Sequence, residues 1–210
     1  MLINVVTIAR EYGSGGAELG RLVAAKLGWE LLDRQLVDRV ARIAGLDPKT
    51  AARLDERAHR WWQFALAGVS HGALYSYSAP DCLSVIDESS VHGLTMRLIQ
   101  RAADSGKCVI VGRGAQAFLQ GRTDVFNVLA YAPVEERARR LQARHGDGAD
   151  VHALIRQVDG QRAKYVREYY GRNWLDKTLY DLCINTALGL EVAAELITTA
   201  IGLAKKEETL

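Results

Sequence analysis

The first 28 residues contain the pattern that most constrains the fold. Residues 2–8 are mostly apolar and β-branched, which predicts a buried first strand of a parallel sheet. A glycine-rich turn follows at residues 13–16, and residues 17–27 then place apolar side chains at helical spacing until Gly28 ends the segment. In a strand, turn and helix of this kind, backbone N–H groups can approach a phosphate at the positive end of the helix. A tight turn without any ligand has the same signature.

Strand-like and helical segments alternate along the rest of the chain, which predicts an α/β fold with a mainly parallel sheet. The expected strands are 29–32, 108–111, 125–130 and 179–185, and the expected helices are 33–45, 91–103, 133–145, 151–170 and 191–204. The pattern becomes irregular from 47 to 89, where we expect an inserted cap region.

Composition and charge exclude several classes of protein. The chain of 210 residues, 49% hydrophobic and 25% charged, suits one soluble domain, and its net charge of +2 is too small for a general nucleic-acid binder. No segment has the character of a membrane span or an export signal, so the expected location is cytoplasmic. The histidines and cysteines show no metal-ligand spacing, and no feature indicates an oligomeric state. Eight of the 20 arginines lie between 137 and 172, where most are expected on helix surfaces and two or three at a functional site.

The glycine-rich turn departs from a complete Walker A loop. Gly16 stands where the lysine is expected, and no hydroxyl follows it, so Arg10 and Ser14 are the candidate substitutes. A dinucleotide fingerprint competes, because Asp33 lies about twenty residues beyond Gly13. That alternative ranks second. The fingerprint requires a third glycine at position 18, which is occupied by Glu18, and the carboxylate of Glu18 would repel a pyrophosphate. The candidate phosphate-binding residues are therefore Gly13, Ser14, Gly15 and Gly16.

Four segments in order resemble the cytidylate kinase-like family. They are residues 10–16 (REYGSGG), 33–34 (DR), 109–114 (VIVGRG) and 180–186 (YDLCINT), and together they span nearly the whole chain. The resemblance implies a P-loop NTPase-like three-layer sandwich with a five-stranded, mainly parallel sheet. It implies a single nucleoside monophosphate kinase-like domain over 1–210, with an inserted acceptor-binding or cap region at 47–89 and a lid region at 146–175.

Cytidylate kinases proper supply the expected roles where positions match. Asp33 and Arg39 keep their spacing of an aspartate and a phosphate-binding arginine, and Arg113 keeps the arginine of their Gly-Arg-Asp, in which Gly114 replaces the aspartate. A helix-surface position is the alternative for Arg39. These three are the expected substrate-binding residues.

A mobile lid in the same enzymes carries arginines that neutralise charge during transfer. Arg156 and Arg162 occupy the corresponding region, although Val158 replaces an arginine there, and an ion pair of Arg162 with Asp159 along the helix is the competing interpretation. With Arg10, they are the candidate catalytic residues.

The resemblance thus implies transfer of a phosphoryl group from ATP, with Mg²⁺, to a small-molecule nucleotide, with CMP or dCMP as the expected acceptor. Positioning and charge neutralisation dominate this chemistry, so arginines can in principle replace a lysine. Two alternatives remain open: a nucleotide-binding regulatory protein with weak or no kinase activity, and a kinase for another small phosphorylated acceptor.

Overall fold

The computed structural model describes residues 2–33, 88–146 and 149–204 of the chain. It divides into two compact units, Met1–Leu31 with Gly106–Leu210, and Leu32–Ser105. The expected helix 33–45, most of the expected cap region 47–89, and Arg39 lie outside the described residues. No helix within the described ranges is long and apolar enough to cross a membrane.

A five-stranded parallel sheet forms the centre of the fold, as predicted. Its strands are β1 (Val5–Arg10), β2 (Glu30–Leu32), β3 (Cys108–Val111), β4 (Val125–Tyr131) and β5 (Leu182–Asn185), in the order β2-β3-β1-β4-β5. The central strand β1 places Ile8 opposite Val111 of β3 and Val128 of β4. All three side chains are almost fully buried, which explains why these strands read as continuous apolar runs.

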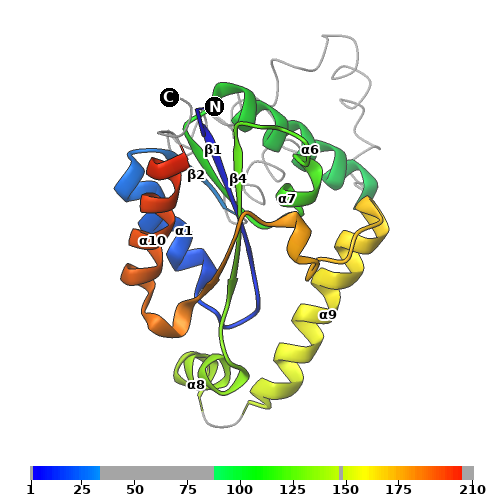
Figure 1. Ribbon diagram of the computed structural model, residues 1–210. Helices are drawn as coiled ribbons and strands as arrows, with labels where there is room; N and C mark the ends of the chain where they lie inside the picture. Colours follow the sequence, from blue (N-terminus) through cyan, green and yellow to red (C-terminus); the bar gives the residue numbers. More distant parts are fainter. Residues whose placement is uncertain (1, 34–87, 147–148, 205–210) are drawn as a thin grey trace, which may run out of the picture. The chain divides into compact units, whose positions relative to one another are not determined.

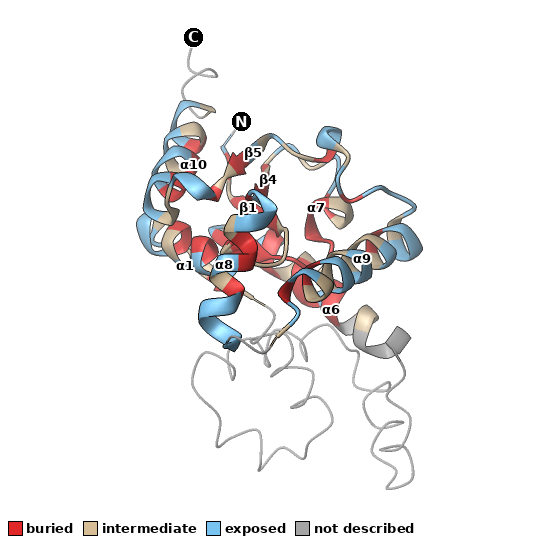
Figure 2. Ribbon diagram, turned by 90° about the horizontal axis from the view of Figure 1, so that it is seen from below, coloured by how far each residue is buried: buried red, intermediate tan, exposed pale blue. Residues whose placement is uncertain are grey.

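Two helices, α1 (Gly16–Leu27) and α10 (Leu190–Ala204), lie side by side against this sheet (Figure 1). Their inward residues, including Leu19, Val23 and Ile197, form one apolar cluster with Val6 and Ile8 of β1. In Figure 2 the red, buried stripe of each helix contrasts with its pale blue outer face. This packing fixes the start of α1, and with it the glycine-rich turn.

The remaining helices of the first unit are α7 (Ala115–Phe118), α8 (Val134–His145) and α9 (Val151–Tyr170). Figure 1 shows α8 beyond the end of β4, close to the turn between β1 and α1. The carboxyl ends of parallel strands are where α/β folds bind ligands, so α8 borders the candidate site.

Three elements differ from the sequence-based expectation. The first strand covers Val5–Arg10 rather than residues 2–8. The last strand begins at Leu182 rather than 179, because Asp176 caps a 3₁₀ turn at Lys177–Leu179 by accepting a hydrogen bond from the Thr178 amide. The four-residue helix α7 was not predicted, since it is too short to show a periodic pattern.

In the second unit, α6 (Glu88–Ser105) extends the predicted helix 91–103 by several residues. Its buried residues include Leu98, Ile99 and Ala102, which recur at helical spacing. The prediction of a helix here is confirmed.

Candidate active site

The glycine loop, residues 11–15, connects the carboxyl end of β1 to the first turn of α1. Gly13 adopts a φ of +83°, a left-handed conformation that favours glycine. A Cβ at position 13 would also lie 2.9 Å from the backbone oxygen of Arg137 in α8. The loop therefore packs directly against the α8 backbone, and both its conformation and its surroundings require glycine at this position.

Side chains from distant parts of the chain bind the carbonyl oxygens of this segment. Arg162 Nη1 donates to the oxygen of Arg10 at 2.7 Å, and Arg137 Nη1 donates to the oxygen of Tyr12 at 3.3 Å. The oxygen of Ser14 accepts from Arg140 Nη1 at 3.0 Å and from Thr186 Oγ1 at 2.6 Å. Three arginines thus donate hydrogen bonds to backbone carbonyl oxygens at one end of the sheet.

The N–H groups of the same segment are used differently. The amide of Tyr12 donates to Asp159 and that of Ser14 donates to the oxygen of Glu11. Within the described part of the chain, the amides of Gly13, Gly15 and Gly16 donate no hydrogen bond. Unpaired N–H groups at the start of a helix, where the dipole is positive, suit an anion.

Arg10, the last residue of β1, lies against two glycines. A Cβ at Gly16 would come within 2.4 Å of Arg10 Cβ and 2.8 Å of its Cγ. A Cβ at Gly112 would overlap the Arg10 guanidinium, at 1.6 Å from Nη1. The Arg10 side chain therefore runs from the position of the missing Walker lysine to the end of β3.

The β3 turn, residues 112–114, is the second glycine-containing turn at this end of the sheet. All three residues have positive φ, +81° at Gly112, +59° at Arg113 and +71° at Gly114. A Cβ at Gly114 would meet the ring of Tyr170 at 2.4 Å and that of Tyr165 at 3.3 Å, so the end of α9 covers this turn. Burial raises the pKa of Tyr165, and the nearby Arg113 guanidinium partly offsets the increase.

Asp159 is the carboxylate that connects α9 to the glycine loop. Its Oδ2 accepts from Arg137 Nη1 at 2.7 Å, and its Oδ1 accepts from the Tyr12 amide at 2.8 Å and from Arg162 at 3.2 Å. Arg137 also pairs with Glu11 at 3.4 Å. Burial raises the pKa of Glu11, although the Arg137 guanidinium and a hydrogen bond from the Ala132 amide lower it.

The structure brings some of the predicted site residues together. Arg10, Arg113, Arg162 and the residues of the glycine-rich turn all lie at the carboxyl ends of β1 and β3 or contact them. Arg156 is exposed and precedes Arg162 by six residues, which places the two about 120° apart around α9. Asp33 is half-buried and directly follows β2. The intrahelical pair of Arg162 with Asp159, the competing interpretation, is present.

Sequence reasoning did not single out Arg137, Arg140 or Thr186 as site residues. The two arginines belong to the arginine-rich region, and Thr186 ends one of the segments that resembles the family. The missed signal is burial: the side chain of Arg137 is only 10% exposed, whereas that of Arg139 is 74% exposed. The pattern of α8 alone does not separate these arginines.

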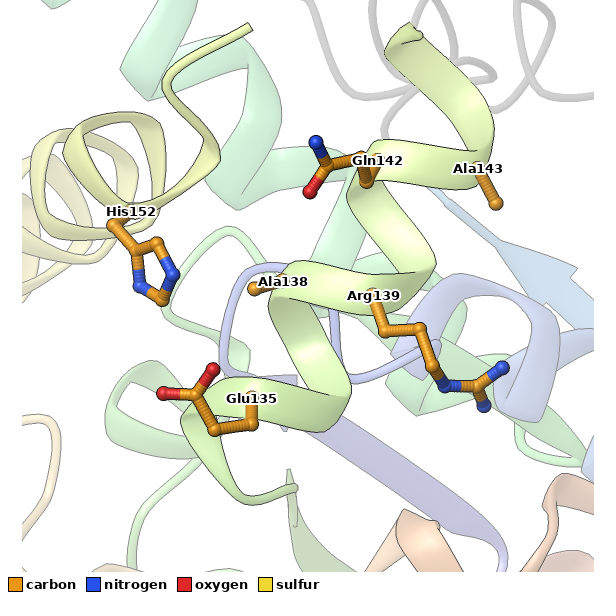
Figure 3. A pocket seen from close by; sticks show the side chains of 6 residues that line it. All are labelled: Glu135, Ala138, Arg139, Gln142, Ala143 and His152. Atoms are coloured by element: carbon orange, nitrogen blue, oxygen red, sulfur yellow. The ribbon is translucent and has the colours of Figure 1, made fainter. Parts of the chain in front are cut away.

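A hollow of about 470 Å³ lies between α8 and α9, lined by Glu135, Arg139 and His152 among others (Figure 3). None of the predicted site residues lines it. It is therefore separate from the candidate active site.

Comparison with known proteins supports the kinase interpretation of this arrangement. Residues 5–188 match the cytidylate kinase-like family. The chain belongs to this family. Membership supports a nucleotide or small-molecule kinase, and it implies use of a nucleotide, typically ATP with Mg²⁺. No curated protein matches the chain.

Solved structures agree with this family in fold. An uncharacterized protein from Eubacterium ventriosum is 19% identical, with a TM-score of 0.67 over 95% of this chain and 98% of that one. Shikimate kinase from Acinetobacter baumannii, in complex with shikimate, is 16% identical, with a TM-score of 0.51 over 97% and 95%. The protein TT1252 from Thermus thermophilus is 22% identical, with a TM-score of 0.51 over 98% and 99%.

The described residues of this cytidylate kinase-like protein fit the phosphates of ATP better than they fit its metal. The open amides of Gly13, Gly15 and Gly16 suit phosphate oxygens. Mg²⁺ is usually held by one or two carboxylates together with substrate phosphates. Both carboxylates at the loop, Glu11 and Asp159, are paired with arginines, and the described residues contain no metal-binding group of three His, Cys, Asp or Glu side chains.

Proposed function

We propose that this protein transfers the terminal phosphoryl group of ATP to a nucleoside monophosphate, with CMP or dCMP as the acceptor. The observation that carries this proposal is the arrangement of the glycine loop. Its carbonyl oxygens are bound by arginines and Thr186, while the amides of Gly13, Gly15 and Gly16 remain open. Open amides at the N-terminus of α1 are suited to phosphates.

Arg10 takes the part of the absent lysine in this proposal. A Cβ at position 16 would lie 2.4 Å from the Cβ of Arg10, so this backbone leaves no room for a side chain at position 16 beside the side chain at position 10. A guanidinium carries a permanent positive charge and can bind two phosphate oxygens at once. Arg10 would thereby neutralise charge on the transferred group without a residue at position 16.

The other arginines have complementary roles. Arg113, together with Asp33 and Arg39, holds the acceptor, and its left-handed backbone supports a functional role, because strained non-glycine residues are concentrated at active sites. Arg156 and Arg162 stabilise the charge that develops during transfer. ATP would supply the phosphoryl group as substrate, and Mg²⁺ brought in with it would supply part of the charge neutralisation. We place this reaction, with its small-molecule substrates, in the cytoplasm, without a nucleic-acid or membrane partner.

The test is ADP release from Mg-ATP with CMP, dCMP, UMP, AMP and GMP offered separately. We expect turnover with CMP and dCMP, and a loss of at least about 100-fold in kcat/KM for Arg113→Ala, the scale of removing one charged contact to a reacting group. Arg139→Ala is the matched control, because Arg139 is exposed and pairs only with Glu136 among the described residues. Turnover by Arg113→Ala equal to that of the control would exclude the role of Arg113.

A regulatory protein that binds a nucleotide without transferring phosphate is the second candidate, and Gly16 at the lysine position favours it. Binding of ATP without turnover on any of the five acceptors would support this candidate over CMP kinase activity. Turnover with a different small phosphorylated acceptor would instead identify a kinase of another specificity.

A further inference from the structure

Helix α8 contributes two arginines to the backbone of the glycine loop. Arg137 and Arg140 are three residues apart, so they lie on the same face of the helix. Arg137 binds the carbonyl oxygen of Tyr12, and Arg140 binds that of Ser14. Their side chains are 10% and 24% exposed, whereas Arg139 between them is 74% exposed.

The choice of carbonyls matters because of peptide geometry. In a planar trans peptide the C=O of one residue and the N–H of the next point in opposite directions. Fixing the oxygen of Tyr12 therefore fixes the direction of the Gly13 amide, and fixing the oxygen of Ser14 fixes that of the Gly15 amide. These are two of the amides that donate no hydrogen bond within the described residues.

Both arginines are themselves held in place. Arg137 Nη1 lies 2.7 Å from Asp159, and its Nε lies 3.4 Å from Glu11. Arg140 donates through Nε to Glu136 at 2.8 Å and through Nη2 to the oxygen of Thr186 at 2.8 Å. Arg140 uses the fork of its guanidinium, with Nε on the Glu136 carboxylate and Nη1 on the Ser14 carbonyl, whereas Nη1 of Arg137 donates both to the Asp159 carboxylate and to the Tyr12 carbonyl.

We infer that Arg137 and Arg140 are positioning residues that aim the Gly13 and Gly15 amides at the phosphates of the bound nucleotide. They act through the loop backbone, without touching the reacting atoms. This inference rests on the proposed function, because it requires an anion on the glycine loop. The inference assigns each arginine to a different amide. A positioning residue should therefore affect one amide more than the other, whereas a residue that only supports the fold should affect both equally.

The experiment is a titration of the ¹⁵N-labelled full-length protein with sodium tripolyphosphate and with Mg-ATP, followed through the amide signals of Gly13 and Gly15. The variants are Arg137→Lys, Arg140→Lys and Arg140→Met, with Arg139→Met as the control on the same helix. The lysine variants keep the charge beside Asp159 and Glu136, but their ammonium groups end one bond short of the Nη1 atoms that bind the loop carbonyls, so they remain informative where Arg140→Met does not fold. A cooperative thermal unfolding transition identifies the variants that are folded.

We expect wild type and Arg139→Met to bind tripolyphosphate alike, and the other variants to bind at least tenfold more weakly. The Gly13 response should be reduced most by Arg137→Lys, and the Gly15 response most by the Arg140 variants. Folded variants that bind like wild type, or that lose both responses equally, would overturn the positioning role while leaving the proposed function intact. A wild-type protein that binds neither probe would overturn both.

Discussion

Two glycine-containing turns at the ends of adjacent strands differ in what surrounds them. The glycine loop after β1 is held through its backbone: its carbonyl oxygens bind side chains from α8 and Thr186 after β5, and its Tyr12 amide donates to Asp159 of α9. The β3 turn is instead filled by side chains, with the Arg10 guanidinium over Gly112 and Tyr170 over Gly114. Both turns also make main-chain hydrogen bonds, but a Cβ added at Gly13 would meet the backbone of α8, whereas a Cβ added at Gly112 or Gly114 would meet side chains.

This difference separates stability from function. When an added Cβ clashes with a backbone atom, no side-chain rotation can relieve the clash. When it clashes with the end of an arginine side chain, a change of rotamer can relieve it. We therefore expect changes in the glycine loop to reduce the free energy of unfolding, and changes in the β3 turn to displace a functional side chain at a smaller cost in stability.

Gly13→Ala should have the largest effect on stability. The added Cβ would meet the backbone oxygen of Arg137 at 2.9 Å, at a φ of +83°. The left-handed conformation costs about 1–2 kcal/mol for a residue other than glycine, and overpacking adds about 1–3 kcal/mol. Urea unfolding should show the free energy of unfolding reduced by about 2–5 kcal/mol. A loss of no more than about 1–2 kcal/mol, the cost of the φ alone, would show that α8 yields to the loop.

Gly16→Ala should have the next largest effect, about 1–3 kcal/mol, because its Cβ would lie 2.4 Å from Arg10 Cβ at a helical position where alanine is otherwise favoured. The double-mutant cycle with Arg10→Gly identifies the cause. If the Cβ and Cγ atoms of Arg10 are the groups in the way, Gly16→Ala should cost less in the Arg10→Gly background, with a coupling of at least about 1 kcal/mol. Additive effects would contradict the steric exclusion between positions 10 and 16.

Gly112→Ala should cost only the left-handed penalty, about 1–2 kcal/mol, because the group in the way is the mobile end of Arg10. Its effect on phosphoryl transfer should be larger than its effect on stability, since the Arg10 guanidinium must leave its place. Both kcat/KM and the free energy of unfolding in urea should be measured for Gly112→Ala and for Gly13→Ala. We expect the loss of activity to dominate in Gly112→Ala and the loss of stability to dominate in Gly13→Ala. Full activity in Gly112→Ala would remove Arg10 from the proposed mechanism.

Sequence patterns predicted the sheet well because its central strands are continuous runs of apolar residues that are buried in the fold. The runs at 108–111 and 125–130 and the glycine-rich turn needed only local information. Asp176 shows where such information fails, since the 3₁₀ turn that it caps takes in Leu179, the first residue of the predicted strand, and the strand begins only at Leu182. Short local hydrogen bonds of this kind compete with strand formation and leave no periodic signal.

The candidate site was predicted only in part for a related reason. Residues 10–16 and Arg113 stand next to strand ends, which the sequence locates. Arg137 and Arg140 reach the loop from more than 100 positions away, and nothing in their spacing distinguishes them from the exposed Arg139. Burial of an arginine against a backbone carbonyl is a property of the folded chain.

Glu11→Gln should have the smallest effect, and its sign decides whether the ion pair with Arg137 stabilises the loop. Because burial outweighs the attraction of Arg137, the pKa of Glu11 is raised, and the folded chain binds a proton there more tightly than the unfolded chain. The contribution of Glu11 to the free energy of unfolding therefore falls as pH rises from about 4.5 through the raised pKa.

Urea unfolding between pH 4 and pH 8 tests this sign. Glu11→Gln should remove that part of the pH dependence and leave the protein within about 1 kcal/mol of wild type, or more stable, at neutral pH. Glu18→Gln, which removes an exposed carboxylate in α1, controls for the loss of one negative charge. A loss of more than about 2 kcal/mol at neutral pH in Glu11→Gln alone would mean that the attraction wins. The expected result would instead show that the buried ion pair of Glu11 with Arg137 adds no net stability to the folded chain.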